Sequence, residues 1–249
     1  MKKLFFYFVT IGVLFSACQK DNSKFGYNPE KESVKKLPSK EYGGMFSRTF
    51  QYDNLNRLIA VIAENGHRYD IWYNDDHTPS RVRSTYGHNN TATSIDTLVY
   101  KGNQVFIFKP NLNPPYVNDT TIITLNSKGE IVESKIGAWY FEGHRYHVNF
   151  IYNSNGNVSR WINSDGEAST TILYTTIPSM FRHVNTPDWF IFYYYLDWSG
   201  DFLYSKKGYM PATGGRWGYD NRFTYEVDND GYGYVTRING KTYQYILAR

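Results

Sequence analysis

The sequence has almost no cysteine, no excess of charge of one sign and no long apolar run. Cys18 is the only cysteine in 249 residues, so no disulfide can form within the chain. Lys and Arg number 27 against 23 Asp and Glu, a balance without the concentrated basic face that nucleic-acid binding needs. The apolar stretch from Leu4 to Phe15 is too short to span a bilayer. These absences argue against a disulfide-framework domain, a nucleic-acid partner and a helical membrane span.

The first residues are typical of an exported lipoprotein. Lys2 and Lys3 precede the apolar stretch, as in a removable signal peptide. The following Phe15-Ser16-Ala17-Cys18 resembles the lipobox of bacterial lipoproteins, in which small residues precede a cysteine that becomes diacylglyceryl-modified. The resemblance implies a signal peptide over residues 1–17, lipidation of Cys18 and attachment to a membrane through that lipid. An ordinary signal peptide with a chance cysteine is the alternative.

The residues after Cys18 predict a tether and a location. Gln19-Lys20-Asp21-Asn22 resembles the signal that some Gram-negative lipoproteins use to reach the outer face of the outer membrane. The resemblance implies a surface-exposed protein of the outer membrane, with the periplasmic face as the alternative. Residues 18–41 are rich in Lys, Glu, Ser, Asn and Pro and show no apolar periodicity, so we expect a flexible tether there.

The rest of the chain, residues 42–249, predicts one all-β domain. Aromatic residues make up 18% of the sequence, which suits half-buried pleated surfaces. Three windows share one spacing of a strand end, a polar turn and a new strand, namely Tyr52 to Leu58, Leu125 to Ile131 and Tyr152 to Val158. Asn, Asp and Gly in these turns tolerate the positive φ that tight hairpins need. We therefore expect an extended, curved antiparallel meander, an open or partly closed barrel-like sheet.

Further windows repeat the pattern less regularly. They are Tyr73 to Val82, Tyr100 to Val105 and Val227 to Val235. Pro79 is expected to lengthen the first of these turns. In the strand that follows Arg57, alternation places Leu58, Ala60 and Ile62 on one face. Strands this rich in Tyr, Thr, Asn and charge do not predict insertion into the bilayer.

These hairpins resemble the tyrosine-aspartate (YD) repeats of RHS-type proteins. The complete layout of lipobox, polar tether, hairpin series, aromatic segment and last hairpin resembles a family of small Gram-negative lipoproteins of unknown function that are described as having a porin-like fold. The resemblance implies a curved antiparallel sheet and brings no catalytic residues with it.

One segment interrupts the hairpin series. Thr186-Pro187-Asp188 provides an N-cap, a proline at the first helical position and an early acid. Trp189, Phe192, Tyr193 and Leu196 follow at helical spacing. We expect a short helix from Pro187 to Asp197, with a fully buried strand as the alternative. Because it is aromatic nearly all round, the helix should lie inside the concavity of the sheet.

Catalytic and metal-binding patterns are weak, so neither an enzyme nor a cofactor is expected. The chain lacks a strand-Ser-helix elbow and an acid pair at a recognisable spacing, although acids on separate strands can converge without leaving a linear trace. His144 and His147 are the only close histidines, and residues three apart in a strand face opposite sides. Asp228-Asn229-Asp230-Gly231 resembles the start of a calcium loop, but Asn239 stands where the loop needs a glutamate, so a plain turn is expected.

Two sets of residues remain as candidate sites. Trp198, Trp217 and Tyr219 lie among glycines and are expected in exposed loops, where their rings can stack on sugars or peptides. Packing in the sheet and core is the alternative for the aromatic residues. Asp96-Thr97-Leu98 and Asp119-Thr120-Thr121 resemble a motif for O-glycosylation of exported proteins, with Thr97 and Thr120 as the modified residues.

Three functions follow in order of preference. The first is a lipid-anchored, non-catalytic binding module for a glycan, a peptide or an envelope protein, through the concave face or the glycine-rich loops. The second is a structural scaffold or accessory subunit that docks on an outer-membrane protein through a sheet edge or an apolar patch. The third is a hydrolase whose acids converge only in the fold.

Overall fold

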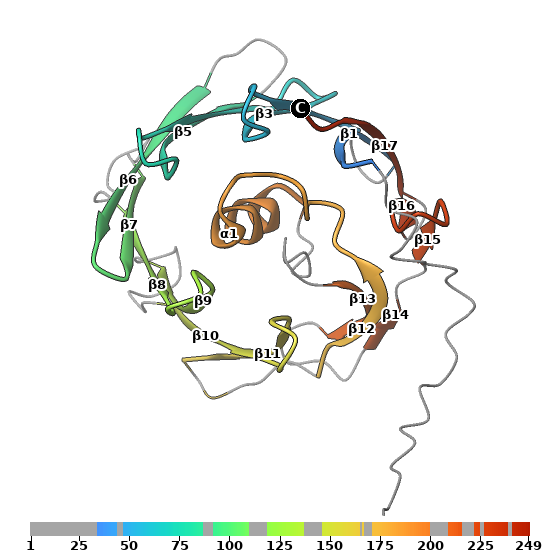
Figure 1. The fold of residues 1–249 in the computed structure, drawn as a ribbon. Coiled ribbons are helices and arrows are strands. Elements are labelled where there is room, and N and C mark those ends of the chain that lie inside the picture. The colour runs from blue at the N-terminus through green and yellow to red at the C-terminus, as the bar shows by residue number, and fades with distance from the viewer. Residues whose placement is uncertain are drawn as a thin grey trace, which may run out of the picture.

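The computed structural model describes residues 34–43, 47–86, 92–109, 119–136, 146–164, 166, 171–199, 209–215, 222–224, 227–238 and 241–249. Within these residues the chain forms 17 strands and one helix (Figure 1). The first eleven strands are β1 (Lys36–Tyr42), β2 (Arg48–Tyr52), β3 (Leu58–Ala63), β4 (Arg68–Tyr73), β5 (Pro79–Tyr86), β6 (Ala92–Lys101), β7 (Gln104–Lys109), β8 (Asp119–Leu125), β9 (Ile131–Ile136), β10 (Tyr146–Tyr152) and β11 (Val158–Asn163). The remaining elements are β12 (Leu173–Pro178), α1 (Asp188–Ser199), β13 (Tyr209–Gly215), β14 (Arg222–Thr224), β15 (Val227–Asn229), β16 (Val235–Ile238) and β17 (Lys241–Leu247).

Fourteen strands form one antiparallel sheet in which sequence neighbours pair. The order runs from β11 back to β1 and then through β17 and β16 to β15, so the first and last strands of the domain pair with each other. β12, β13 and β14 form a second sheet, which lies between the two ends of the large sheet in Figure 1. The amide of Ile172 donates to the carbonyl of Ser159 and ties this second sheet to β11. The predicted curved antiparallel meander is confirmed.

Five hairpins share one turn of five residues that begins with Asp or Asn. These turns are residues 53–57, 74–78, 126–130, 153–157 and 230–234. In each, the first amide donates to the carbonyl of the fifth residue, and the fourth residue has a φ between 61° and 81°. At the fourth turn, Asn153 Oδ1 also accepts from the amides of Asn155 and Asn157, at 3.0 and 3.1 Å. The fourth position of the turn therefore requires a residue that tolerates a left-handed backbone, since most side chains are strained at a positive φ.

Tyrosine hydroxyls link successive hairpins. Tyr152, at the end of β10, donates to the carbonyl of Ile131, the first residue after the preceding shared turn, at 2.8 Å. Six such bonds of 2.6 to 2.9 Å link neighbouring strands in the described part of the chain, and we call them tyrosine bridges: Tyr52 to Pro38, Tyr73 to Leu58, Tyr100 to Pro79, Tyr152 to Ile131, Tyr174 to Val158 and Tyr245 to Val235. They explain why tyrosine so often stands directly before the turn, since a buried hydroxyl and a buried carbonyl each need a partner.

Two expectations for the hairpins are wrong. The turn after Tyr73 has the same length as the others, because His77 adopts the left-handed φ of 68° and Pro79 simply begins β5. In β3, Val61 lies in the core with Leu58, while Ile62 is only half-buried. The register shifts between Gln51 and Tyr52, so a bulge inverts the alternation beyond Leu58.

The start of the domain also differs from the expected tether boundary at residue 41. β1 begins at Lys36 and pairs with β17 along its whole length. Its Glu41 is fully buried, with Arg48 Nη1 of β2 at 2.8 Å and Lys241 Nζ of β17 at 3.7 Å. Partner strands on both sides thus order a polar, lysine-rich stretch that composition alone assigns to a tether. Residues 18–33 of the expected tether, Cys18 among them, lie outside the described residues.

The helix occupies the interior of the curved sheet. α1 lies at the centre of the ring of strands in Figure 1 and is set among buried aromatic residues, which confirms the predicted short helix. The hydroxyl of Thr186 lies 2.8 Å from the amide of Leu58 and 2.6 Å from the hydroxyl of Tyr73, so the start of the helix is fixed to β3 and β4. No helix in the described part of the chain is both long and apolar enough to cross a membrane.

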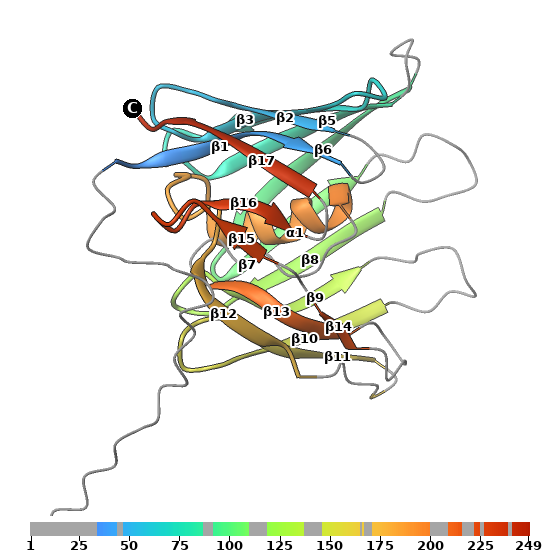
Figure 2. The same ribbon diagram turned by 90° about the vertical axis from the view of Figure 1, so that its right-hand side faces the viewer.

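The described turns of five residues gather at one rim of the sheet. β1 begins and β17 ends at this rim, at the left of Figure 2, where the C-terminus is marked. We call it the tight-turn rim. The segment of residues 179–187 that leads from β12 into α1 also reaches it, because the amide of Asn185 donates to the carbonyl of Asn56 at 2.9 Å.

Candidate functional site

Among the described residues, side chains of α1 fill the concave face of the sheet. Phe190 of α1 is fully buried, and the ring of Phe192 packs edge-on against Phe150 of β10 with centroids 5.5 Å apart. Tyr194 donates from its hydroxyl to the buried carboxylate of Asp96 at 3.0 Å. A ligand site on the concave face, one of the two surfaces expected for a binding module, is therefore not supported by the described residues.

The predicted aromatic platform lies largely beyond what the structure describes. Trp217 and Tyr219 fall outside the described residues, and Trp198 lies in α1 but its side chain is not described. Trp161 and Trp189 are buried in the core. Trp72 alone among the described tryptophans is exposed, at 42%, with the Arg83 guanidinium 5.3 Å from its ring. Packing thus accounts for two of the three described tryptophans.

The two candidate O-glycosylation residues lie in one row. Thr97 and Thr120 are both register partners of Phe108, so the three side chains lie side by side across β6, β7 and β8. Thr97 is exposed and Thr120 half-buried. The carboxylate of Asp96, the acid of the first motif, is buried against α1 instead.

Several of the described carboxylates are held in ion pairs and turns. Burial alone would raise the pKa of Glu133, but hydrogen bonds from Lys135, Thr124 and His147 outweigh it and hold this pKa below its usual value. His147 Nε2 lies 2.7 Å from this carboxylate, while His144 lies outside the described residues. Among the residues that the structure describes, no three His, Cys, Asp or Glu side chains are close enough to hold one metal ion.

The residues that resemble a calcium loop form a turn and bind other parts of the chain. Asp230 Oδ1 accepts from the amides of Tyr232 and Tyr234, while its Oδ2 pairs with Lys36 Nζ at 3.2 Å. Asp228 pairs with Arg237 on β16 at 2.7 Å. Both carboxylates thus bind groups of the protein and hold β15 and β16 in place.

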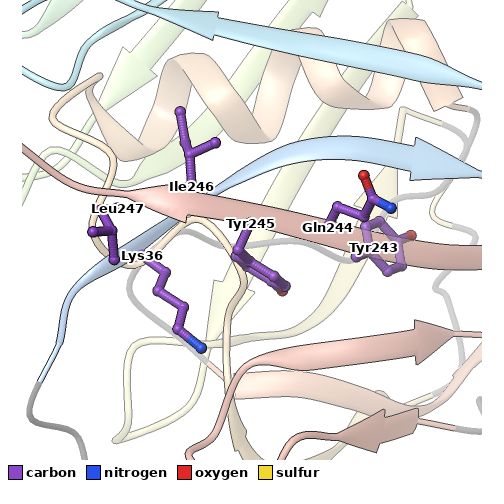
Figure 3. A pocket seen from close by; sticks show the side chains of 6 residues that line it. All are labelled: Lys36, Tyr243, Gln244, Tyr245, Ile246 and Leu247. Carbon is purple, nitrogen blue, oxygen red and sulfur yellow. The ribbon is translucent and has the colours of Figure 1, made fainter.

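The large sheet opens between β16 and β17. These two strands pair only at their hairpin end, through Arg237 with Thr242 and Ile238 with Lys241, and they separate toward the tight-turn rim in Figure 2. A hollow of about 570 Å³ follows β17 there, and we call it the β17 groove. It is lined by Lys36 and by Tyr243, Gln244, Tyr245, Ile246 and Leu247 (Figure 3).

The lining of the β17 groove shows that it follows the edge of the strand. Its residues are consecutive, and Figure 3 shows Ile246 and Tyr245 leaving β17 in opposite directions. A hollow over one face of a sheet would instead be lined by alternate residues. Ile246 and Leu247 are 47% and 66% exposed, so the open end of the edge carries apolar side chains.

The backbone of β17 presents hydrogen-bonding groups to this groove. The amide of Ala248 donates to Lys35 on the β1 side at 2.9 Å. Backbone groups alternate between the two sides of a strand, so those of Leu247 and Tyr245 point away from β1 and toward the groove. No described strand pairs with Gln244–Leu247 on that side. The edge therefore has the form of an acceptor for one more strand.

Sequence reasoning did not identify this groove. The last hairpin was expected from Asp230 and Gly231, but nothing in residues 235–247 marks the point at which the strands separate. The one available signal is the apolar pair Ile246 and Leu247 at the end of the strand, after Thr242 to Tyr245, which alternate polar and aromatic residues.

Comparisons with known proteins add a fold likeness only. No protein-family model matches the chain, and no curated protein matches it. Among solved structures, the chain is similar to a porin-like protein from Bacteroides uniformis ATCC 8492, with 15% sequence identity and a TM-score of 0.41 over 86% of this chain and 97% of that chain.

Proposed function

We propose that the chain is a lipid-anchored, non-catalytic interaction module of the outer membrane that binds an extended segment of a partner protein along β17. The observation that carries the proposal is the open edge of Gln244–Leu247, in a sheet whose concave face is filled. Strand addition at such an edge obtains affinity from main-chain hydrogen bonds and specificity from alternate side chains.

The chemistry of the edge suits a peptide better than a sugar. Each added main-chain hydrogen bond contributes about 0.5–1.5 kcal/mol net, and the backbones of Tyr245 and Leu247 offer both donors and acceptors. Exposed Ile246 and Leu247 add apolar area at the same place. A partner segment that alternates apolar and polar residues would pair with the edge and cover these side chains.

A proline substitution tests the proposal directly. The probe is a fluorescein-labelled heptapeptide of alternating Val and Thr, titrated against the full chain by fluorescence anisotropy. Leu247→Pro removes the amide that faces the groove while the bonds of the neighbouring residues to β1 remain, so we expect affinity to fall by about tenfold. Leu247→Ala is the matched control, because it removes the side chain and keeps the amide.

The outcome separates strand addition from simple apolar contact. Amide chemical shifts of Tyr245 and Leu247 should move on titration of the unsubstituted chain. If the proline and alanine variants bind equally, or the peptide perturbs another face, strand addition at β17 is wrong. A thermal unfolding curve for each variant distinguishes the loss of peptide binding at the strand edge from unfolding of the domain.

The membrane anchor is a separate part of the proposal. It is supported by the lipobox resemblance at Cys18 and by the order of leader, polar tether and domain. The mature protein should carry the mass of a diacylated N-terminal cysteine, and Cys18→Ser should abolish it. A mature mass equal to that of the bare chain would contradict the anchor.

A second candidate function is favoured by the outer face of the sheet. Val99, Phe106 and Ile122 are register partners across β6, β7 and β8, and exposed Ile95 and Phe108 lie on the same strands. A patch of this kind suits docking on a protein scaffold. The outer face would replace β17 as the proposed binding surface if Phe108→Ser abolished the binding of a protein partner and Leu247→Pro did not change that binding.

A further inference from the structure

A second hollow, which we call the rim pocket, adjoins the β17 groove at the tight-turn rim. Its volume is about 370 Å³, and its lining is strongly cationic. It is lined by Lys35, Arg182, Arg249, His183, Asn56 and Asn185, together with Ala248. No acidic side chain is among these lining residues. We propose that the rim pocket binds a phosphate group.

The pocket is built from four segments held together by hydrogen bonds. Asn56 Nδ2 donates to the carbonyl of Arg249 at 2.7 Å, and Asn56 Oδ1 accepts from the amide of Arg249 at 2.9 Å. The backbone of Asn56 accepts from Asn185, and Ala248 donates to Lys35. The first shared turn, the start of β1, the end of β17 and the segment before α1 thus keep fixed positions, so the pocket exists before a ligand arrives.

One cation of the pocket is oriented by its surroundings. Arg182 Nη1 donates to the carbonyl of Gly233 at 3.0 Å, and its guanidinium lies 4.1 Å from the centroid of the Tyr234 ring. A guanidinium held in one orientation loses little entropy when it binds an oxyanion. Lys35 and Arg249 add two exposed cations. An α-carboxylate on Arg249 would subtract one charge and still leave the set cationic.

Phosphate fits this set of donors better than a carboxylate. Arg and Lys donate charge-assisted hydrogen bonds. Asn56 and Asn185 form the polar wall of the same space, held by their own bonds to Arg249 and Leu55. A tetrahedral oxyanion accepts bonds from several directions at once, whereas a carboxylate accepts them in one plane. The volume leaves room for a substituent on the phosphate, so a lipid headgroup and free phosphate share the required chemistry.

The place of the pocket favours the headgroup as the source. Lys35 lies directly before β1, and the expected anchor at Cys18 precedes it in the chain, so the anchor is joined to β1 through a residue that lines the pocket. A domain tethered at this rim has the rim pocket on the side from which the tether leaves. Anionic headgroups attract Lys and Arg side chains near a membrane surface.

The test compares two soluble probes on the full chain. Inorganic phosphate and glycerophosphoglycerol, the phosphodiester of a lipid headgroup, are titrated at matched ionic strength. Binding is followed by the NMR signals of Arg182 Nε and of the amides of Asn185 and Arg249. We expect saturable shifts at these positions with at least one probe. Tighter binding of the phosphodiester identifies the headgroup as the source, and tighter binding of inorganic phosphate identifies the free anion.

A matched pair of variants keeps the proposal falsifiable without disturbing the fold. Lys35→Gln with Arg249→Gln removes two pocket charges and none of the backbone hydrogen bonds, so phosphate affinity should fall about tenfold. Lys40→Gln with Lys101→Gln removes the same net charge elsewhere and should change affinity less than about twofold. Equal losses in the two double variants, or no shifts at the pocket signals, would overturn the proposal. This test does not involve Leu247, so its outcome is independent of whether β17 accepts an added strand.

Discussion

Two hairpins of the large sheet use five-residue turns with the same side-chain cap in different surroundings, although Gly231 in one of them is also left-handed, with a φ of 79°. Asn153 and Asp230 each accept two backbone amides with the side-chain Oδ1, and each turn has a left-handed glycine at its fourth position. β10 and β11 then pair from Tyr152 to Val148, whereas β15 and β16 form only three register pairs. The same turn chemistry therefore decides where the chain reverses but not how far the strands remain paired.

The tyrosine bridges show what compensates where pairing ends. In the regular part, Tyr152 links strands that are already joined through the sheet. Beside the β17 groove, Tyr245 bonds across to Val235 although β16 and β17 have separated, and its ring contacts Tyr234 with centroids 5.2 Å apart. In the regular region the tyrosine bridge adds to the backbone hydrogen bonds between paired strands. Beside the β17 groove it joins two strands that have no backbone hydrogen bonds between them at that point.

The largest expected effect is loss of stability at alkaline pH, which tests whether both regions depend on their bridges. Burial raises the pKa of the bridging hydroxyls of Tyr52, Tyr73, Tyr100, Tyr152 and Tyr245 above the usual 10.0. Above that pH the unfolded chain releases these protons while the folded chain retains them, so stability is full below pH 10 and falls as pH rises. Each hydroxyl contributes a slope of about 1.4 kcal/mol per pH unit.

The measurement is urea unfolding at a series of pH values, with tyrosinate absorbance recorded alongside. Tyr152→Phe removes one titrating hydroxyl. The decrease of the free energy of unfolding with pH above pH 10 should therefore become smaller by about 1.4 kcal/mol per pH unit. Tyr42→Phe, which removes a hydroxyl that donates to Gln244 Oε1, is the control for the general effect of this substitution on stability at neutral pH. A stability that is flat from pH 9 to 11 would contradict the role of buried hydroxyls.

An intermediate effect is expected from alanine at the fourth turn position. Gly156 and Gly233 have φ values of 77° and 81°, so alanine at either costs roughly 1–2 kcal/mol of backbone strain. Gly156→Ala should lower the global free energy of unfolding, because β10 is paired on both sides and β11 forms five register pairs with it. Gly233→Ala should instead increase local opening of β15 and β16, which have few register pairs.

Hydrogen exchange resolved by residue distinguishes the two results. Amides of Val227–Asn229 and Val235–Ile238 should exchange faster in Gly233→Ala at a nearly unchanged urea midpoint. Gly129→Ala, at the equivalent turn of β8 and β9, is the control and should behave like Gly156→Ala. Identical global losses from Gly156→Ala and Gly233→Ala would mean that the two regions unfold as one unit.

The sequence predicts the hairpins because their turns are local. Asn153, Gly156 and their equivalents act through bonds within five residues, so their spacing can be read directly. The bulge that moves Val61 into the core and the strand that begins at Lys36 are different, since both depend on partner strands. β1 is ordered by β17, which lies some 200 residues away in sequence. Such pairing leaves no trace in a single window.

The candidate sites show the same limit more strongly. The β17 groove exists because two strands separate, and the rim pocket combines Lys35, Asn56, Arg182 and Arg249 from four distant segments. No spacing rule connects these residues. The sequence instead directed attention to Trp198 and Trp217, whose glycine-rich surroundings are a local feature. Local signals thus predict the repeat, while sites assembled from distant strands are visible only in the folded structure.

The smallest expected effect compares two tyrosine bridges directly. Tyr152→Phe and Tyr245→Phe each remove one hydroxyl and leave a carbonyl without that donor, at a cost of about 0.5–1.5 kcal/mol by urea unfolding. In the regular region the neighbouring ladder still fixes the strands, so exchange of β10 amides should change little. At the groove no ladder replaces the lost bond, so Tyr245→Phe should also speed exchange of Val235 and weaken binding of the Val-Thr heptapeptide. If Tyr152→Phe and Tyr245→Phe alter amide exchange and peptide affinity alike, the bridge at Tyr245 does not hold the groove in its open shape. The two regions would then differ only in where their turns stand.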